Sequence, residues 1–500
     1  MHAIEAKGKS NYVIYRWTVE TGIVGEYSME GNRLPDCLYT AKESPPVARS
    51  SRPPSHPRIS AMKRALPVVG LSLAMLFSGT HLASAETRNF EVTVQSGKLA
   101  RSETPVSVVF EVPTALANAE VQLQDADGHG IAAQLTPLGL GDSSSPPASP
   151  TSATQPRELH FVLPILDAGA TLTLKGSLAK PVDFAKPEGF SWNDVPKDHI
   201  RLWYRDRPVM DYMDAPLDDS TKESREKTFK VYHHLYDPED GSRLVTKGPG
   251  GLYTHHRGLF YGFQRVSYGA TKTKQVNIWE CANAHQSHEG VLSSEAGSVL
   301  GRQLLAIDWH GPEKTSSAEE KLVFAHEQRE ITVYHVPGGT MVDAVSLLKV
   351  ADLGPVRLDG DPQHAGFQFR AAQEVADKTK GQTIYIRPDG VGAPGETRNW
   401  DAKKRDPICV NLPWKGMSFV LGDQRYTAAI LDRPDNPKEA RYSERDYGRF
   451  GSYFEYNLTK EKPLLIHYRV WLQRGQATQK RIAAMADDFV DPVQATVQMK

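Results

Sequence analysis

The chain has 500 residues, with 39% hydrophobic and 24% charged side chains and a formal net charge of -1 at pH 7. This composition is typical of a globular protein with two or more domains and excludes a fibrous, disordered or integral membrane protein. Residues 1–85 hold 10 of the 59 Lys and Arg and 6 of the 60 Asp and Glu, so the remainder has a net charge of -5. That balance argues against nucleic acid or anionic lipid as the main partner.

A secretory signal peptide is predicted at residues 62–85. It consists of a basic start (MKR), an apolar run at 65–77 that is too short to span a bilayer, and the small residues ASA before Glu86. Because a signal peptide begins a chain, we predict that translation starts at Met62 and that residues 1–61 are a misassigned or non-native extension. The alternative is a genuine extension ahead of an internal apolar segment. Cleavage after Ala85 would place the mature protein in the periplasm or outside the cell.

Short strands are predicted between residues 86 and 185. Segments such as FEVTVQ, VSVVFEV and ATLTLKGSL show alternation or short β-rich runs between turn residues. We expect them to form a small antiparallel β-sandwich. Residues 141–156 (GDSSSPPASPTSATQP) are too polar and proline-rich to pack and are predicted to be a disordered surface insertion. No catalytic pattern is visible here, so the expected role is to cover or extend the next domain.

Strand signals continue through a larger segment at residues 200–475. Runs such as GLFYGFQRVSYG, QTIYIRP and PLLIHYRVWLQRG are separated by Gly, Pro and Asp turns, with few helical periods. The predicted fold class is therefore all-β, with a large antiparallel, supersandwich-like β-sandwich after the smaller one. Residues 476–500 are predicted to be a C-terminal helix and tail, because Ile482, Met485 and Phe489 have helical spacing.

Histidines concentrate in one part of the large segment. Nine of the 17 histidines lie between His233 and His335, and His255 and His256 are adjacent in the aromatic run THHRGLFYGF. In an extended backbone their side chains would leave opposite faces. We therefore expect only one of the two to face a binding groove, while the other is structural.

His285 and His288 follow in ECANAHQSHEG, which lacks strand alternation and is predicted to be a loop. With His255 or His256 they would offer three neutral imidazoles and an open position, the arrangement of a catalytic zinc or similar divalent ion. The spacing matches no metal motif, so structural histidines and metal-free acid–base roles remain alternatives.

Further candidates lie near residues 279, 364 and 444. His364 begins a predicted strand after a DGDP turn and either reaches into a groove or caps that turn. Residues 441–450 gather charged and aromatic side chains that suit the recognition of carboxylates, phosphates or sugar hydroxyls, or that form solvated surface. The candidate catalytic residues are His256, His364, Glu444, Arg257 and Glu280, and the candidate substrate-binding residues are Trp279, Arg445, Tyr447 and Arg370.

Three segments resemble a family of exported bacterial proteins named methane oxygenase PmoA. They are HHRGLFYG at 255–262, the segment 279–288 and QHAGFQFR at 363–370, within a resemblance that covers residues 201–475. A membrane methane oxygenase needs spans of about 20 apolar residues. The sequence lacks such a span, so we do not expect that activity.

The chain is also similar, more loosely, to galactose mutarotase-like supersandwiches, in which histidines from neighbouring strands and a carboxylate line a sugar groove. This resemblance implies that His256 and His364 are the groove histidines and Glu444 the carboxylate. Arg257 stands where the pattern often has a third basic or imidazole residue. The resemblance therefore does not supply a third histidine at that position.

These observations predict an exported protein that acts on or binds carbohydrate. As an epimerase, lyase or hydrolase, it would use one imidazole to donate a proton at a sugar carbon, while a carboxylate or second imidazole accepts one. A bound divalent metal is a variant of that mechanism. The alternative is a non-catalytic carbohydrate-binding or structural protein. Cys281 and Cys409, the cysteines that follow residue 85, could pair in an oxidising compartment.

Overall fold

The structure is a computed structural model that describes three strands between residues 7 and 30 and residues 87–142, 153–180, 189–314 and 321–500. Residues 1–80 form a unit of their own, with an antiparallel sheet of β1 (Lys7–Gly8), β2 (Tyr12–Thr18) and β3 (Val24–Glu30). The predicted signal peptide lies outside the described residues. Of the predicted insertion, residues 143–152 also lie outside them, whereas residues 154–156 belong to strand β9 and correct that prediction.

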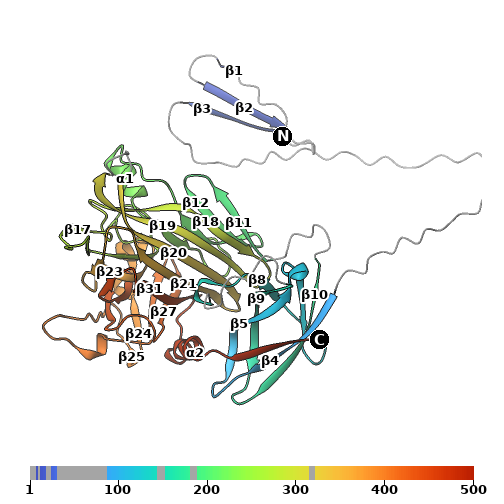
Figure 1. The fold of residues 1–500 in the computed structure, drawn as a ribbon. Helices are drawn as coiled ribbons and strands as arrows, with labels where there is room; N and C mark the ends of the chain where they lie inside the picture. Colours follow the sequence, from blue (N-terminus) through green and yellow to red (C-terminus); the bar gives the residue numbers. More distant parts are fainter. Residues whose placement is uncertain are drawn as a thin grey trace, which may run out of the picture. The chain divides into compact units, whose positions relative to one another are not determined.

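The small β-sandwich consists of two antiparallel sheets (Figure 1). The first has the order β32 (Gln494–Met499), β4 (Thr87–Gln95), β10 (Thr171–Ala179), β6 (Glu120–Gln124) and β7 (Gly130–Ile131). The second has the order β5 (Arg101–Pro113), β9 (Thr154–Leu166) and β8 (Ala133–Thr136). Their inward-facing side chains form a separate apolar core that includes Val92, Leu159 and Phe161.

The last strand of the chain completes this sandwich. β32 pairs with β4, and Ala495, Val497 and Met499 pack against the core of the small sandwich. The predicted C-terminal tail is therefore wrong, because alternate residues of this segment can bury one apolar face on a sheet edge.

The large domain is built on two broad antiparallel sheets. The eight-stranded sheet has the order β11 (Phe190–Val195), β12 (His199–Tyr204), β13 (Arg207–Met213), β14 (Tyr232–Leu235), β15 (Leu259–Phe263), β23 (Ala365–Arg370), β29 (Arg449–Tyr453) and β28 (Arg441–Arg445). The nine-stranded sheet has the order β18 (His285–Ala296), β19 (Leu300–Lys314), β20 (Lys321–Val336), β21 (Gly339–Val350), β31 (Leu464–Arg474), β27 (Gln424–Asp432), β26 (Trp414–Leu421), β24 (Ile384–Arg387) and β25 (Gly390–Val391).

A third, four-stranded sheet of the large domain has the order β17 (Lys274–Val276), β16 (Arg265–Tyr268), β22 (Val356–Asp359) and β30 (Tyr456–Leu458). The α-helices are α1 (Lys222–Thr228) and α2 (Gln479–Val490). Short helical turns lie at Thr114–Leu116, Leu140–Asp142, Val375–Thr379, Lys380–Gln382 and Pro407–Cys409. The all-β fold class is confirmed, with the smaller sandwich ahead of the larger.

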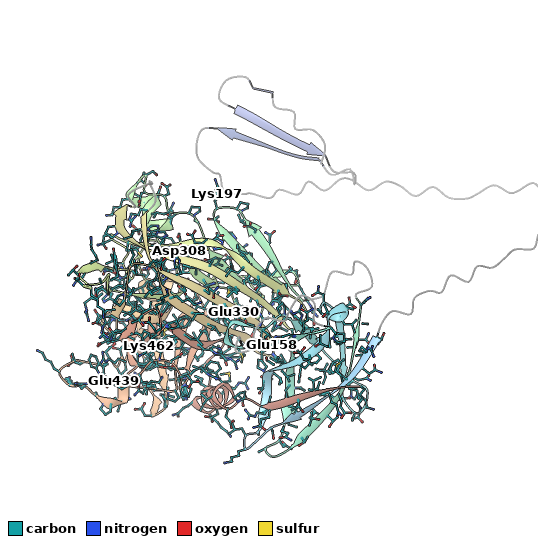
Figure 2. The ribbon with its side chains drawn as sticks, in the orientation of Figure 1. Glu158, Lys197, Asp308, Glu330, Glu439 and Lys462 are labelled. Carbon is teal, nitrogen blue, oxygen red and sulfur yellow. The ribbon has the colours of Figure 1, made fainter. Side chains whose placement is uncertain are left out.

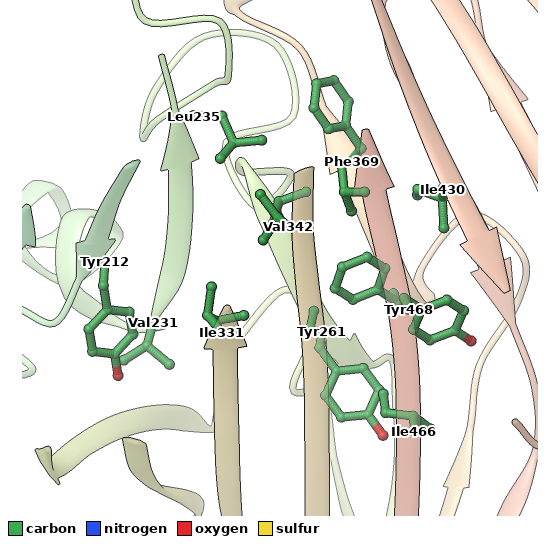
Figure 3. Close-up of a cluster of buried hydrophobic side chains, with 14 of the residues drawn as sticks. Tyr212, Val231, Leu235, Tyr261, Ile331, Val342, Phe369, Ile430, Ile466 and Tyr468 are labelled. Carbon is green, nitrogen blue, oxygen red and sulfur yellow. The ribbon is translucent and has the colours of Figure 1, made fainter. Parts of the chain in front are cut away.

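The main core lies between the eight- and nine-stranded sheets, and Figure 3 shows part of it. Tyr261 and Phe369 come from the first sheet, and Val342 and Tyr468 come from the second. Because side chains alternate along a strand, residues next to these in sequence point away from the core. The eight-stranded sheet therefore presents a second face, and this face carries the candidate site.

Helix α2 covers another surface of the nine-stranded sheet. Thr478 caps its N-terminus by accepting a hydrogen bond from the Arg481 amide at 3.1 Å. Ile482, Met485 and Phe489, the three residues with helical spacing, are all buried. No helix in the described part of the chain is long and apolar enough to cross a membrane.

Buried polar contacts join the small sandwich to the nine-stranded sheet. Arg302 of β19 donates to Glu158 of β9 at 2.9 Å and to Thr136 at 2.7 Å. Glu330 of β20 accepts a hydrogen bond from the Leu140 amide at 2.9 Å. Figure 2 labels both Glu158 and Glu330, on β9 and β20. The junction thus contains one buried ion pair, between Arg302 and Glu158, and further hydrogen bonds to neutral groups.

Candidate functional site

Three histidines converge in the large domain. Ring nitrogens of His255, His256 and His364 lie within 4.8 Å of one another. The ring centroids are 4.4 Å apart for His255 and His256 and 5.8 Å apart for His364 and each of the others. Nε2 of His255 and both ring nitrogens of His256 are buried and have no hydrogen-bond partner among the described residues. The arrangement leaves these nitrogens available to a ligand.

Both adjacent histidines join the cluster because their backbone is a turn. Residues 252–255 form turns, and the His256 amide donates to the Tyr253 carbonyl oxygen at 2.9 Å. The expectation that only one of His255 and His256 faces the site is therefore wrong, since side chains alternate only along an extended strand. Gly258 ends this segment with a φ of 27°, where an added Cβ would meet the His233 carbonyl oxygen at 1.9 Å. Glycine is needed at that close approach.

The site is carried by the outward face of the eight-stranded sheet. In β23, Phe367 and Phe369 point into the core, so Gln368 and Arg370 point to the opposite face. In β15, Phe260 likewise leaves the main core and packs with Trp279 and Tyr232. His364 directly precedes β23, and the turn with His255 and His256 precedes β15; the two strands pair with each other.

Buried cations surround the imidazoles. Burial and, second to it, the charge of Lys230 lower the pKa of His255 to about 3. Burial and Arg449 lower the pKa of His256 well below its ordinary value. Burial also lowers the pKa of both Lys230 and Lys247 to about 7. His255 and His256 are therefore uncharged near neutral pH, the state in which imidazole binds metals.

A carboxylate orients the third histidine. Nδ1 of His364 donates to Oδ1 of Asp361 at 3.0 Å, which leaves Nε2 as the nitrogen for a ligand. The same oxygen accepts a hydrogen bond from the Gln363 amide at 2.8 Å. His364 is partly exposed, with 29% of its side chain accessible. The turn cap is thus made by Asp361, while the imidazole of His364 reaches the cluster.

Aromatic side chains enclose the cluster. The ring of Tyr447 is nearly parallel to that of His256 at 6.3 Å, and Trp279 meets His256 edge to face at 5.6 Å. Trp279 is fully buried, so its ring offers no surface to a substrate, and its prediction as a substrate-binding residue is wrong. Tyr253 lies 5.2 Å from Tyr447 and is 47% exposed. It therefore marks the solvent side of the site.

His285 and His288 have other partners. They lie in strand β18 rather than the predicted loop. His285 stacks on His310 at 4.2 Å, and Nδ1 of His288 lies 3.2 Å from the Tyr212 hydroxyl. The structure does not bring them to the three-histidine cluster, since their strand belongs to the nine-stranded sheet. The predicted metal site, made of His255 or His256 together with His285 and His288, is therefore wrong, because His285 and His288 do not belong to the cluster.

Glu444 is held in a separate buried ion-pair cluster. Arg387 donates to its carboxylate at 2.8 and 2.7 Å, and Nζ of Lys415 lies 2.8 Å away. These cations hold the pKa of Glu444 below its usual value, despite the opposing effect of burial. Glu444 is completely buried and fully paired. It does not serve as the groove carboxylate.

Two other catalytic candidates have structural contacts. Arg257 donates to the carbonyl oxygens of Lys227 at 3.4 Å and of Glu226, at the end of α1, where a cation stabilises the helix C-terminus. Glu280 accepts a hydrogen bond from Asn277 at 3.1 Å within a turn. Neither side chain forms a hydrogen bond with the imidazoles of the cluster. Cys281 and Cys409 are both buried free thiols.

The predicted binding residues divide into two groups. Tyr447 and Arg370 lie at the cluster, where the guanidinium of Arg370 stands 4.9 Å from the Tyr447 ring. Arg445 donates to Asn399 at 2.9 Å, beside the site rather than in it. Sequence reasoning missed four residues at the cluster: Lys230, Lys247, Asp361 and Arg449. The DGDP turn before His364 was the one available signal, because it placed Asp361 three residues from a histidine.

Comparison with known proteins gives a family and little more. The model of a family of unknown function, DUF6807, matches residues 199–487. No curated protein matches the chain. Similar solved structures include an α-mannosidase (9% identity, TM-score 0.38) and a glycosyl hydrolase family 38 protein (10% identity, TM-score 0.39), both from Enterococcus faecalis. The matches cover 82% of this chain but only 46% and 47% of those chains, and similarity at this level carries no functional argument.

Proposed function

We propose that this chain, which belongs to the DUF6807 family of unknown function, binds a divalent transition metal ion through His255, His256 and His364. The observation that carries the proposal is the convergence of three imidazoles within 4.8 Å. Imidazole nitrogen suits Zn, Cu, Fe and Ni. Three protein ligands leave a coordination position for water or substrate, as in catalytic metal sites.

Two observations favour a metal over metal-free proton transfer. His255 and His256 have pKa values far below neutrality, so neither is in the protonated imidazolium form that acts as a general acid at neutral pH. Glu444, the expected carboxylate, is locked between Arg387 and Lys415. A bound ion would supply Lewis acidity. The protein's own residues would then hold the ligand nitrogens in place, through Asp361 at His364.

We propose a carbohydrate as the substrate of this site and an exported location for the protein. The support is the resemblance of residues 201–475 to exported PmoA-named proteins and to mutarotase-like supersandwiches, together with the signal-like segment at 62–85. Tyr253 and Tyr447 add ring surface and hydroxyl groups beside the imidazoles. The competing function is carbohydrate binding without turnover at the same site.

The test is metal analysis of the full chain purified without a histidine tag. After incubation with Zn, Mn, Fe or Cu salts and removal of the excess, we expect one ion per chain. His256→Ala and His364→Ala should lose it, whereas His288→Ala, outside the cluster, should retain it. Substoichiometric metal throughout would overturn the metal proposal. Turnover on a panel of sugars separates enzyme from binding protein, since binding without turnover supports the competing function.

A further inference from the structure

Besides Arg257, which caps the end of α1, four basic side chains near the histidine cluster are buried without a carboxylate partner among the described residues. They are Lys230, Lys247, Arg370 and Arg449, and each is at most 2% exposed. Within the described part of the chain, no ion pair joins any of them to Asp or Glu. Burying an uncompensated charge is costly, and buried charges are normally paired.

Among the described residues, both lysines donate their hydrogen bonds to backbone carbonyl groups. Nζ of Lys230 donates to the carbonyl oxygens of His255, at 2.9 Å, and of Trp279. Nζ of Lys247 donates to the carbonyl oxygens of Gly248, at 3.0 Å, and of Gly250, at 2.5 Å. These bonds tie together the loops that carry the site. They provide no counter-charge to the protonated form of either lysine.

The two arginines also have neutral partners. Nη1 of Arg449 donates to the Gln368 amide oxygen at 2.6 Å, and Nη2 donates to the Ser443 hydroxyl at 3.1 Å. Nη1 of Arg370 donates to the Ala371 carbonyl oxygen at 3.0 Å and to that of Tyr447. Nε and Nη2 of Arg370, and Nε of Arg449, are buried without a hydrogen-bond partner among the described residues.

Elsewhere in the described chain, buried arginines other than Arg257 pair with carboxylates. Arg387 donates two hydrogen bonds to the Glu444 carboxylate, at 2.8 and 2.7 Å. Arg469 donates two to the Asp343 carboxylate, at 2.6 and 2.7 Å. Both use the edge formed by Nε and Nη2, which matches the two oxygens of a carboxylate. In Arg370 this edge is the one without a partner. The fold thus supplies a carboxylate to such an edge elsewhere and omits it at the site.

We infer that the ligand of the three-histidine site is a sugar acid, whose carboxylate supplies the negative charge that the protein leaves out and pairs with Arg370. The inference rests on the proposed function, since it names the substrate class of that site. The ring of Tyr447 links the two parts, because it neighbours both His256 at 6.3 Å and the Arg370 guanidinium at 4.9 Å. Arg449 adds a second positive charge beside Arg370 and forms no ion pair with Asp or Glu among the described residues.

The experiment compares two probes that differ at one carbon, D-glucuronate and D-glucose, by calorimetric titration of the full chain at constant ionic strength. We expect glucuronate to bind at least about tenfold more tightly, since a charge-assisted pair at a buried arginine exceeds 1.4 kcal/mol. Arg370→Gln should remove this preference, and Arg370→Lys should restore part of it. Arg265→Gln is the matched control, because Arg265 is largely exposed and pairs with Asp359.

A second measurement covers variants that fail to fold. Acetate, at fixed ionic strength against chloride, should compete with glucuronate for the wild-type protein. Equal affinities for the two sugars, no measurable binding of glucuronate, or binding insensitive to acetate would overturn the inference. Metal analysis separates the two proposals. If the protein binds metal but does not prefer glucuronate to glucose, only the sugar-acid inference is overturned. If glucuronate binds in an Arg370-dependent way to a protein that takes up no metal, only the metal proposal is overturned.

Discussion

Asp361 accepts a hydrogen bond from Nδ1 of His364 at 3.0 Å, and this contact fixes which imidazole nitrogen faces His255 and His256. Carboxylates that hold a metal-ligating histidine in this way raise its basicity and fix its orientation. Asp361 is therefore a positioning residue of the site, contributed by the turn before β23.

Asp361→Asn should weaken metal affinity by about 10–100-fold without changing the ligand set. The physical reason is loss of the charged acceptor that fixes the His364 tautomer. Competition with a chelator measures the affinity, and the exposed Asp352→Asn serves as the control. An affinity equal to wild type would show that the contact with Asp361 only caps the turn.

Acid should destabilise the protein through His234. Burial lowers its pKa to about 4, from 6.5 in the unfolded chain. Between these two pH values the unfolded state binds more protons than the folded state. The stability that this group contributes is therefore fully present above pH 6.5 and is lost as the pH falls towards 4. The loss from this group is at most roughly 3 kcal/mol. Urea unfolding at several pH values gives the free energy of unfolding as a function of pH. Its dependence on pH should be weaker in His234→Gln than in the wild type, and unchanged in the exposed His129→Gln. A pH-independent wild type would contradict this expectation.

Glu444→Gln should reduce stability by roughly 3–5 kcal/mol, because Lys415 would remain buried with no counter-charge and Arg387 would keep only its ion pair with the partly exposed Glu396. Chemical denaturation measures the change. Glu439→Gln is the control, since Glu439 forms a partly exposed pair with Arg441. A variant of wild-type stability that had lost turnover would instead restore the catalytic role suggested by the sequence.

Val497→Asp should destabilise the small sandwich by about 1–3 kcal/mol. Val497 lies opposite Val92 in the pairing of β32 with β4 and packs on that core. The neighbouring Gln498→Asp places the same side chain on the exposed face and should change little. The midpoint of denaturant unfolding and the rate of proteolysis after α2 report the effect. Equal midpoints for the two variants would mean that β32 contributes no stability.

The residues of α2 and of β15 show what could be predicted from sequence. Ile482, Met485 and Phe489 recur at helical spacing, and a helix follows because that period buries one apolar stripe. The run after Gly258 forms a strand, but the histidines before it were placed in an extended backbone that the structure replaces by a turn. A turn at residues 252–255 depends on contacts with Lys247 and Lys230, which lie in other segments.

By itself, the sequence determined the all-β class, the concentration of histidines and the candidate status of His255, His256 and His364, because strand periodicity and residue type are local properties. The tertiary structure decided which of the histidines meet and that Asp361 orients one of them. It also decided that Glu444 forms ion pairs with Arg387 and Lys415, and that the last strand pairs within the small sandwich. The physical reason is that strand order and register set contacts between distant segments. Whether a buried charge finds a partner is likewise decided only by what the folded chain brings beside it.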